Sequence, residues 1–134
     1  MLEAHQEFGS AACDLFVAIE QTSLDAVASE VTFLEVLASP KLQGDLINQT
    51  RRSLEQLGVR FHSVSKDALL SAAELRRQHG CGAFDAIHVA QAISQGCSQF
   101  ITNDRSLLKK QIPGISLVSI QTPLTTIIKN DNVL

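Results

Sequence analysis

The sequence contains no tryptophan and no tyrosine, and phenylalanine occurs only six times. Single-strand-binding proteins stack nucleic-acid bases on exposed aromatic side chains, so that class is poorly supported here. Basic charge is also scarce, because 11 Lys and Arg stand against 14 Asp and Glu, for a formal net charge of −3. Since phosphate neutralisation dominates non-specific nucleic-acid binding, the composition argues against a coat protein. It leaves room for an enzyme with a local basic rim.

Cysteine and long apolar runs are equally limited. Cys13, Cys81 and Cys97 are odd in number and widely spaced, which argues against a disulfide framework, does not match zinc-ligand spacing and favours buried, reduced thiols. The amino terminus has an acid, Glu3, where a signal peptide needs positive charge. No segment reaches the roughly 18 consecutive apolar residues of a membrane span. A cytoplasmic protein is therefore expected.

Familiar catalytic motifs are missing too. The sequence has no glycine-rich phosphate loop, no dinucleotide fingerprint and no nucleophile elbow. What it has is 134 residues, 45% of them hydrophobic, with a mean hydropathy of +0.11. That is enough chain for a single core. We expect one domain over residues 1–120, followed by a tail over residues 121–134 that does not continue its pattern.

Helical and extended patterns alternate along the chain. Helices are predicted over residues 7–21, 30–39, 45–57, 66–79, 84–95 and 105–111, and strands over 24–28, 59–64, 99–102 and 115–120. Strands separated by helices indicate parallel pairing with right-handed crossovers, and therefore a layered α/β domain. The helix over 84–95 is apolar on nearly every side, so it is expected to be central and buried.

Three acidic residues occupy unusual positions. Each has a structural explanation of its own: Glu35 can lie on the solvent-exposed face of a helix, Asp85 can be a favourable charge at a helix N-terminus, and Asp104 can be an N-cap. Taken together they suggest more, because ligands of open α/β sheets bind at the carboxyl ends of strands. Asp104 follows such a strand end, and the two helical acids can reach the same crevice.

Clustered carboxylates repel one another unless a cation lies between them. Mg²⁺ and Mn²⁺ are the natural partners of carboxylate oxygens, so the expected chemistry is metal-assisted hydrolysis at a phosphorus centre. His88, three residues after Asp85, is interpreted as a neighbour that packs or hydrogen-bonds in this region rather than as a ligand.

Four ordered segments resemble the PIN-domain family, and within it the VapC-type toxins of bacterial toxin–antitoxin pairs. They are residues 29–40 (SEVTFLEVLASP), 72–76 (AAELR), 84–92 (FDAIHVAQA) and 100–104 (FITND). Each segment is modest alone, but their order and spacing agree with the family over about residues 3–120.

The resemblance implies a three-layer α/β/α sandwich with a central parallel sheet. It also implies a Mg²⁺- or Mn²⁺-dependent endoribonuclease, frequently a homodimer, that acts on RNA and in many relatives is held inactive by an antitoxin protein. Carried over residue by residue, it makes Glu35, Asp85 and Asp104 the catalytic metal ligands. The polar side chains expected to support these ligands are those of Thr32, Thr102 and Asn103.

One part of the family pattern has no counterpart here. The family begins with a strand that ends in Asp-x-Asn and supplies the first acid, whereas this sequence starts beyond that point. We therefore expect the first strand to be missing or replaced, with weaker metal binding and reduced activity. Residues 124–134, an apolar run ending in NDNVL, loosely echo that strand. One hypothesis places them in its position with Asp131 near the metal; the simpler alternative is a surface tail.

Two functions remain open at this point. The first is a ribonuclease whose phosphate-steering rim draws on the basic residues Arg51, Arg52, Arg76, Arg77, Arg105, Lys109 and Lys110. The second is a catalytically impaired PIN-like module that binds a partner protein or itself. An exposed strand edge left by a missing first strand would favour the second, because such edges pair with other segments.

Overall fold

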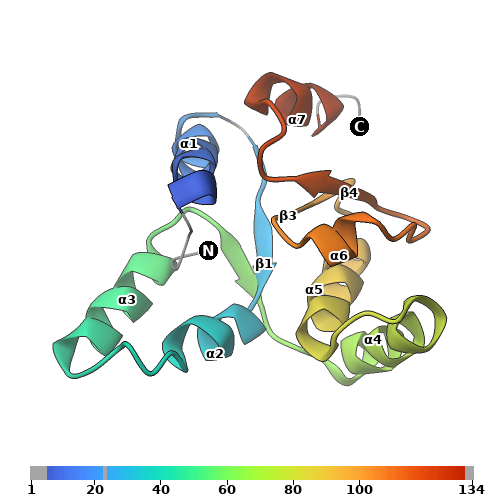
Figure 1. The fold of residues 1–134 in the computed structure, drawn as a ribbon, viewed down its shortest axis with the longest axis horizontal. Helices are drawn as coiled ribbons and strands as arrows, with labels where there is room; N and C mark the ends of the chain where they lie inside the picture. Colours follow the sequence, from blue (N-terminus) through green and yellow to red (C-terminus); the bar gives the residue numbers. More distant parts are fainter. Residues whose placement is uncertain (1–5, 23, 132–134) are drawn as a thin grey trace.

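The computed structural model describes residues 6–22 and 24–131 (Figure 1). Its elements, in chain order, are α1 (Gln6–Gln21), β1 (Val27–Ser29), α2 (Val31–Leu37), α3 (Asp45–Glu55), β2 (Arg60–His62), α4 (Lys66–His79), α5 (Ala83–Ser94), β3 (Gln99–Thr102), α6 (Arg105–Leu108), β4 (Ser116–Ser119) and α7 (Leu124–Asp131). The strands and helices predicted over residues 7–120 are all present, most of them shorter at one or both ends. The α/β fold class is confirmed.

All strand pairing in the described chain is parallel. β1 pairs with β2 in the register Val27 to Arg60, and β3 pairs with β4 in the register Gln99 to Ser116. The two pairs are not hydrogen-bonded to each other, so the described residues form two two-stranded sheets rather than one continuous sheet. Parallel pairing is what short strands joined by helices impose, and the division into two pairs agrees with the exposed strand edge that the sequence analysis expected.

Helices cover the strands from both sides. α4 packs along α5, α5 packs on β1, and α2 contacts both α3 and α5. In Figure 1, β1 and β2 lie between α1, α2 and α3 on one side and the α4–α5 pair on the other. The arrangement is consistent with an α/β/α sandwich built on a small sheet. The main core cluster gathers between α4, α5 and α6 and comprises Ala72, Cys81, Ala86, Val89, Ala90, Leu107 and Ile112.

The predicted central helix is largely confirmed as buried. Ala86 and Val89 are fully inaccessible, and Gln91 is only 4% exposed. Phe84 departs from the prediction, since 41% of it remains exposed in the first turn of α5. Helical periodicity identifies a face of a helix, but it does not say where a neighbouring element stops covering that face.

Helix α4 has well-defined ends. The Ser65 side chain accepts a hydrogen bond from the Ala68 backbone N–H at 3.1 Å, which satisfies one of the donors left open at a helix N-terminus. At the other end Gly80 adopts a left-handed conformation with φ of +68°, which glycine allows without a Cβ clash. The Lys110 ammonium donates to the His79 carbonyl at 2.7 Å and helps to close this end.

Ser65→Ala is expected to destabilise the protein by about 1 kcal/mol, since an N-cap serine is worth roughly 0.5–2 kcal/mol. For a domain of this size the melting temperature should fall by about 3–6 °C. Ser71→Ala provides the matched control, because Ser71 is an exposed residue in the interior of the same helix, where alanine is the better helix former. Differential scanning calorimetry of both variants checks the assignment; equal melting temperatures for the two variants would contradict it.

The tail forms a helix and not a strand. Residues 124–131 make up α7, in which Ile127 is 2% exposed and its carbonyl accepts a hydrogen bond from the Gln99 side-chain amide at 2.9 Å. The hypothesis that this tail supplies the first strand is therefore wrong for the part that the structure describes; residues 132–134 lie outside it. The domain boundary at residue 120 stays a prediction.

Two smaller expectations are also settled in part. Cys81 is buried as expected, Cys97 is half-buried, and Cys13 is exposed, contrary to the expectation of a buried thiol. Among the described helices, none combines the length and apolar character needed to cross a membrane.

Candidate functional site

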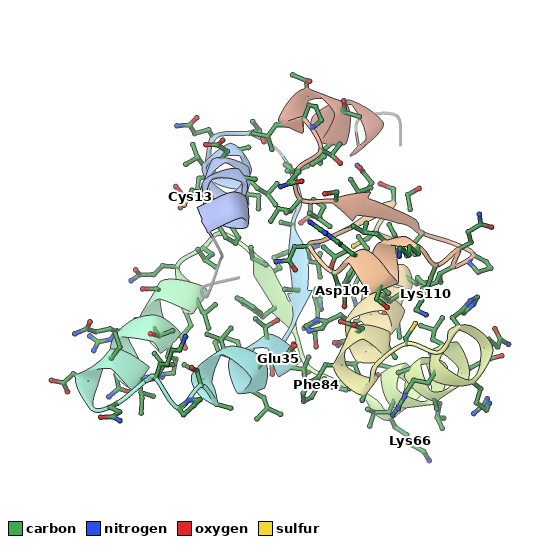
Figure 2. The ribbon with its side chains drawn as sticks, viewed as in Figure 1. Cys13, Glu35, Lys66, Phe84, Asp104 and Lys110 are labelled. Carbon is green, nitrogen blue, oxygen red and sulfur yellow. The ribbon has the colours of Figure 1, made fainter. Side chains whose placement is uncertain are left out.

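The three predicted site residues come from three different elements and approach one another at one end of the strands. Glu35 lies in α2, directly after β1. Asp85 lies in the first turn of α5. Asp104 follows β3 and caps α6. Figure 2 shows Glu35 and Asp104 near the middle of the molecule rather than at its periphery. Glu35 and Asp104 therefore follow the carboxyl ends of β1 and β3, the side on which α/β sheets bind their ligands.

Asp85 is the central member of this acidic group. Its pKa is raised above the ordinary value of 3.8, first by burial, then by the charge of Asp104 and hydrogen bonding to it, with a smaller contribution from the charge of Glu35. His88 opposes the rise. Burial and like charge both disfavour ionisation of a carboxyl group. Asp85 therefore interacts electrostatically with both other acids.

Asp104 is held firmly by its backbone surroundings. Its Oδ1 accepts hydrogen bonds from the backbone N–H groups of Ser106 at 2.8 Å and Leu107 at 3.2 Å. Its own N–H donates to the Thr102 hydroxyl at 3.1 Å. The predicted N-cap role is confirmed, and it does not compete with a role in a site. These bonds use Oδ1 and leave Oδ2 outside the cap.

Glu35 is oriented by a residue far away in the sequence. Its Oε1 forms a short hydrogen bond with His88 Nε2. The His88 side chain is 17% exposed and that of Glu35 is 37% exposed, so the pair is only partly screened by water. His88 acts here as a hydrogen-bonding partner of an acid, as its position beside Asp85 suggested. The sequence did not indicate that Glu35 would be that acid.

A cavity of about 750 Å³ opens beside these residues. Glu35, Asp85 and His88 line it, together with Thr32 and Asn103. The remaining lining comes mainly from α1 and from the facing strands β1 and β3. The supporting polar residues expected from the sequence, namely Thr32, Thr102 and Asn103, therefore all lie at or along this cavity.

The acids meet in pairs rather than as a closed ligand set. Across residues 6–22 and 24–131, no three His, Cys, Asp or Glu side chains are grouped closely enough to hold one metal ion. The chemistry of the donors nevertheless fits a hard divalent cation, because all three are carboxylates. Burial first, and the charge of Asp104 second, raise the pKa of Asp85, and a bound cation would offset both effects. Glu35 would have to turn from His88 to join a shared ion.

Some of the proposed basic rim is already engaged elsewhere. Arg51 pairs with Glu55 at 3.8 Å along α3, the Arg52 guanidinium donates to the Asn48 carbonyl, and Lys110 closes α4. Arg105 is exposed and directly follows Asp104 in the chain. Of the rim residues suggested by the sequence, Arg105 is the one adjacent to an acid of the site in the chain.

A model of the PIN-domain family matches residues 3–112, well over half of the chain. No curated protein matches it. PIN domains are generally nucleases, typically dependent on Mg²⁺ or Mn²⁺, so the match supports a nuclease-type, hydrolytic function. The ordered acidic segments, the parallel α/β architecture and this match agree: the chain belongs to the PIN-domain family.

Proposed function

We propose that this protein is a divalent-cation-dependent endoribonuclease in which Glu35, Asp85 and Asp104 hold Mg²⁺ or Mn²⁺. The observation that carries the proposal is that Glu35 and Asp85 line one cavity beyond the carboxyl ends of β1 and β3, with Asp104 directly after Asn103 of the same lining. Such a cation supplies Lewis-acid stabilisation to a phosphodiester undergoing hydrolysis. A carboxylate site of this kind is unfavourable without a cation, because burial and the charge of Asp104 both raise the pKa of Asp85.

The residues of the chain have distinct tasks in this proposal. Asp104 is fixed by the α6 cap and keeps one oxygen outside the cap. His88 orients Glu35 and limits its rotation. Thr102 fixes the backbone that precedes the cap. Arg105 is placed to attract RNA phosphate, which Arg binds readily in bidentate geometry. Partial burial of the site strengthens each charged interaction relative to bulk water.

Cleavage of single-stranded RNA with increasing Mg²⁺ or Mn²⁺, with EDTA as the blank, tests the proposal. Asp104→Asn is the sharpest variant, because asparagine caps a helix about as well as aspartate while removing the charge. We expect cation-dependent cleavage by the wild type and a loss of roughly 100-fold or more in the variant, since losing even an outer partner of a metal ligand costs about 10–100-fold. Cleavage that is unchanged in Asp104→Asn would reject this site.

Cation binding should also stabilise the fold. At 100 times its dissociation constant, Mn²⁺ is expected to add about 2.7 kcal/mol, which corresponds to a rise in melting temperature of about 10 °C for a domain of this size. The rise should shrink as the pH is lowered toward the raised pKa of Asp85, because protons then compete with the cation for that carboxylate. Thermal unfolding with Mn²⁺ or EDTA at several pH values measures it; a rise that grows on acidification would contradict the assignment.

The proposal extends to the biological role of the protein and to the proteins that it binds. The family resemblance supports a toxin of a toxin–antitoxin pair, an antitoxin protein as its inhibitor, and a homodimer as its assembly. Expression of the chain with and without the product of a small neighbouring gene, followed by cell growth and size-exclusion chromatography, tests all three. Neutral growth without that gene product would argue against a toxin.

A second function is favoured by one observation. The described acids do not form a closed ligand set, which suits a PIN-like interaction module that has lost catalysis. This alternative predicts a stable dimer or hetero-complex together with no measurable affinity for Mn²⁺ by calorimetry. The ribonuclease proposal predicts the opposite result for the cation.

A further inference from the structure

A side-chain hydrogen bond joins helix α2 to helix α5. Glu35 lies within α2, and its Oε1 is bonded to Nε2 of His88 in α5. Because a carboxylate only accepts hydrogen bonds, the imidazole Nε2 is the donor. Hydrogen bonds that involve an ionised group are stronger than bonds between neutral groups. Glu35 therefore has a defined partner that is not one of the other two acids.

The partner of Glu35 lies close to Asp85 on the same helix. Asp85 and His88 are three residues apart in α5, so they lie on one face of it with about 5–6 Å between their Cβ atoms. Both of them line the cavity, as does Glu35. The carboxylate of Glu35 thus meets α5 about one helical turn away from the carboxylate with which it would share a cation.

The two members of this hydrogen bond differ in their freedom to move. His88 is the less exposed of the two side chains, and it belongs to a helix with Val89 and Ala90 in the core. Glu35 is the more exposed side chain, and its helix α2 contains no buried residue. A glutamate side chain also has a high rotamer entropy when it is not held. Glu35 is therefore the member that moves when the bond breaks.

The position that His88 gives to Glu35 is not a ligand position for a shared ion. Within residues 6–22 and 24–131, no three acidic, histidine or cysteine side chains are close enough to hold one metal ion. To lie against one ion together with Asp85 and Asp104, the Glu35 carboxylate has to rotate away from the place where His88 holds it. The hydrogen bond opposes that rotation.

We propose that His88 competes with the divalent cation for Glu35. The imidazole holds the carboxylate in one rotamer, and the cation draws it into a second rotamer beside Asp85 and Asp104. This exchange rests on the proposed cation site, and His88 acts in it as a positioning residue, through Glu35. Removal of His88 should strengthen cation binding. A partner that supports a metal ligand has the opposite effect, because its removal costs about 10–100-fold in affinity.

Calorimetric titration with Mn²⁺ measures the competition. His88→Leu removes the donor, and His79→Leu is the matched control, because His79 is a half-buried histidine of α4 outside the cavity. We expect affinity to rise about tenfold in His88→Leu, from the loss of a hydrogen bond to a charged group, and to stay unchanged in His79→Leu. His88→Gln keeps an N–H donor and should fall between the wild type and His88→Leu. Circular dichroism checks that each variant folds.

The possible results separate this inference from the proposed function. If the wild type binds Mn²⁺ and His88→Leu binds it equally or more weakly, the competition is overturned while the cation site stands. If neither protein binds Mn²⁺, the cation site and the competition are both overturned. Binding by His88→Leu without measurable binding by the wild type would support the competition, since the hydrogen bond would then outweigh the cation.

Nuclear magnetic resonance of the histidine rings follows the exchange in the wild-type protein. Mg²⁺ is diamagnetic and serves as the probe, and the Glu35→Ala variant shows where the His88 ring nitrogens resonate without their partner. Saturating Mg²⁺, judged from the backbone amide signals, should move the wild-type His88 Nε2 resonance toward that position and leave the His79 ring unchanged. A purely structural role of His88 predicts no such movement. A His88 resonance that stays in place at saturation would show that Glu35 keeps its bond, and would overturn the proposal.

Discussion

Asp85→Asn is expected to abolish cation-dependent RNA cleavage while leaving the protein at least as stable as the matched control Asp67→Asn. Both residues are acids in the first turn of a helix, Asp85 in α5 and Asp67 in α4. Each loses the favourable interaction of a carboxylate with a helix N-terminus, worth about 0.3–1 kcal/mol. Only the Asp85 substitution also removes the cost of a buried negative charge and its repulsion by Asp104 and Glu35.

The direction of the expected change in stability follows from the raised pKa of Asp85. A carboxyl group whose pKa is higher in the folded state contributes stability below its ordinary pKa of 3.8, and that contribution is lost as the pH rises through the folded-state value. At neutral pH the ionised group therefore costs stability, and asparagine removes the cost. Unfolding in urea at pH 7 and RNA cleavage with Mn²⁺ measure the two effects. An Asp85→Asn protein less stable than Asp67→Asn, or one that still cleaves RNA, would contradict this account.

Leu107→Ala is expected to cost about 2–5 kcal/mol, the usual penalty for emptying a buried leucine site. Leu107 is 1% exposed and belongs to the core cluster. It anchors α6, a helix of only four residues, so little else replaces its contacts. The melting temperature should fall by about 10 °C or more, out of a total stability that for domains is about 5–15 kcal/mol.

Leu70→Ala supplies the control for this substitution. Leu70 is 58% exposed on α4, and exposed substitutions usually change stability by less than about 0.5 kcal/mol. Calorimetry of the two variants should therefore separate them clearly. The Leu107 side chain holds α6 against the core, and its backbone N–H donates to Asp104. The variant should therefore also bind Mn²⁺ more weakly at temperatures where it remains folded. Unchanged stability would mean that α6 is not docked as described.

Much of the architecture could be predicted because it depends on local pattern. The alternation of apolar and polar residues predicted four strands and the helices between them, and the chain order of these elements predicted parallel pairing. Element ends were less predictable, since the helix expected over residues 105–111 ends at Leu108. One hypothesis placed the tail in a strand on a loose likeness of sequence, beside the simpler alternative of a surface tail, whereas residues 124–131 form a helix with Ile127 buried.

The place of each acid in the fold could be predicted from the sequence, and its use in a common site stays a prediction. Asp104 could be placed at a strand end, and Asp85 at a helix start, by rules that use neighbouring residues only. The pairing of Glu35 with His88 joins residues 53 positions apart, and side-chain rotamers of that kind leave no periodic signal.

The account depends most on a single cation held between Glu35, Asp85 and Asp104. Isothermal titration calorimetry of the metal-free protein with Mn²⁺ tests this directly. We expect one ion per chain, with affinity reduced about 100-fold or more in Glu35→Gln, Asp85→Asn and Asp104→Asn alike, and unchanged in Asp67→Asn. Binding that is absent in the wild type, or that survives all three substitutions, would contradict the account.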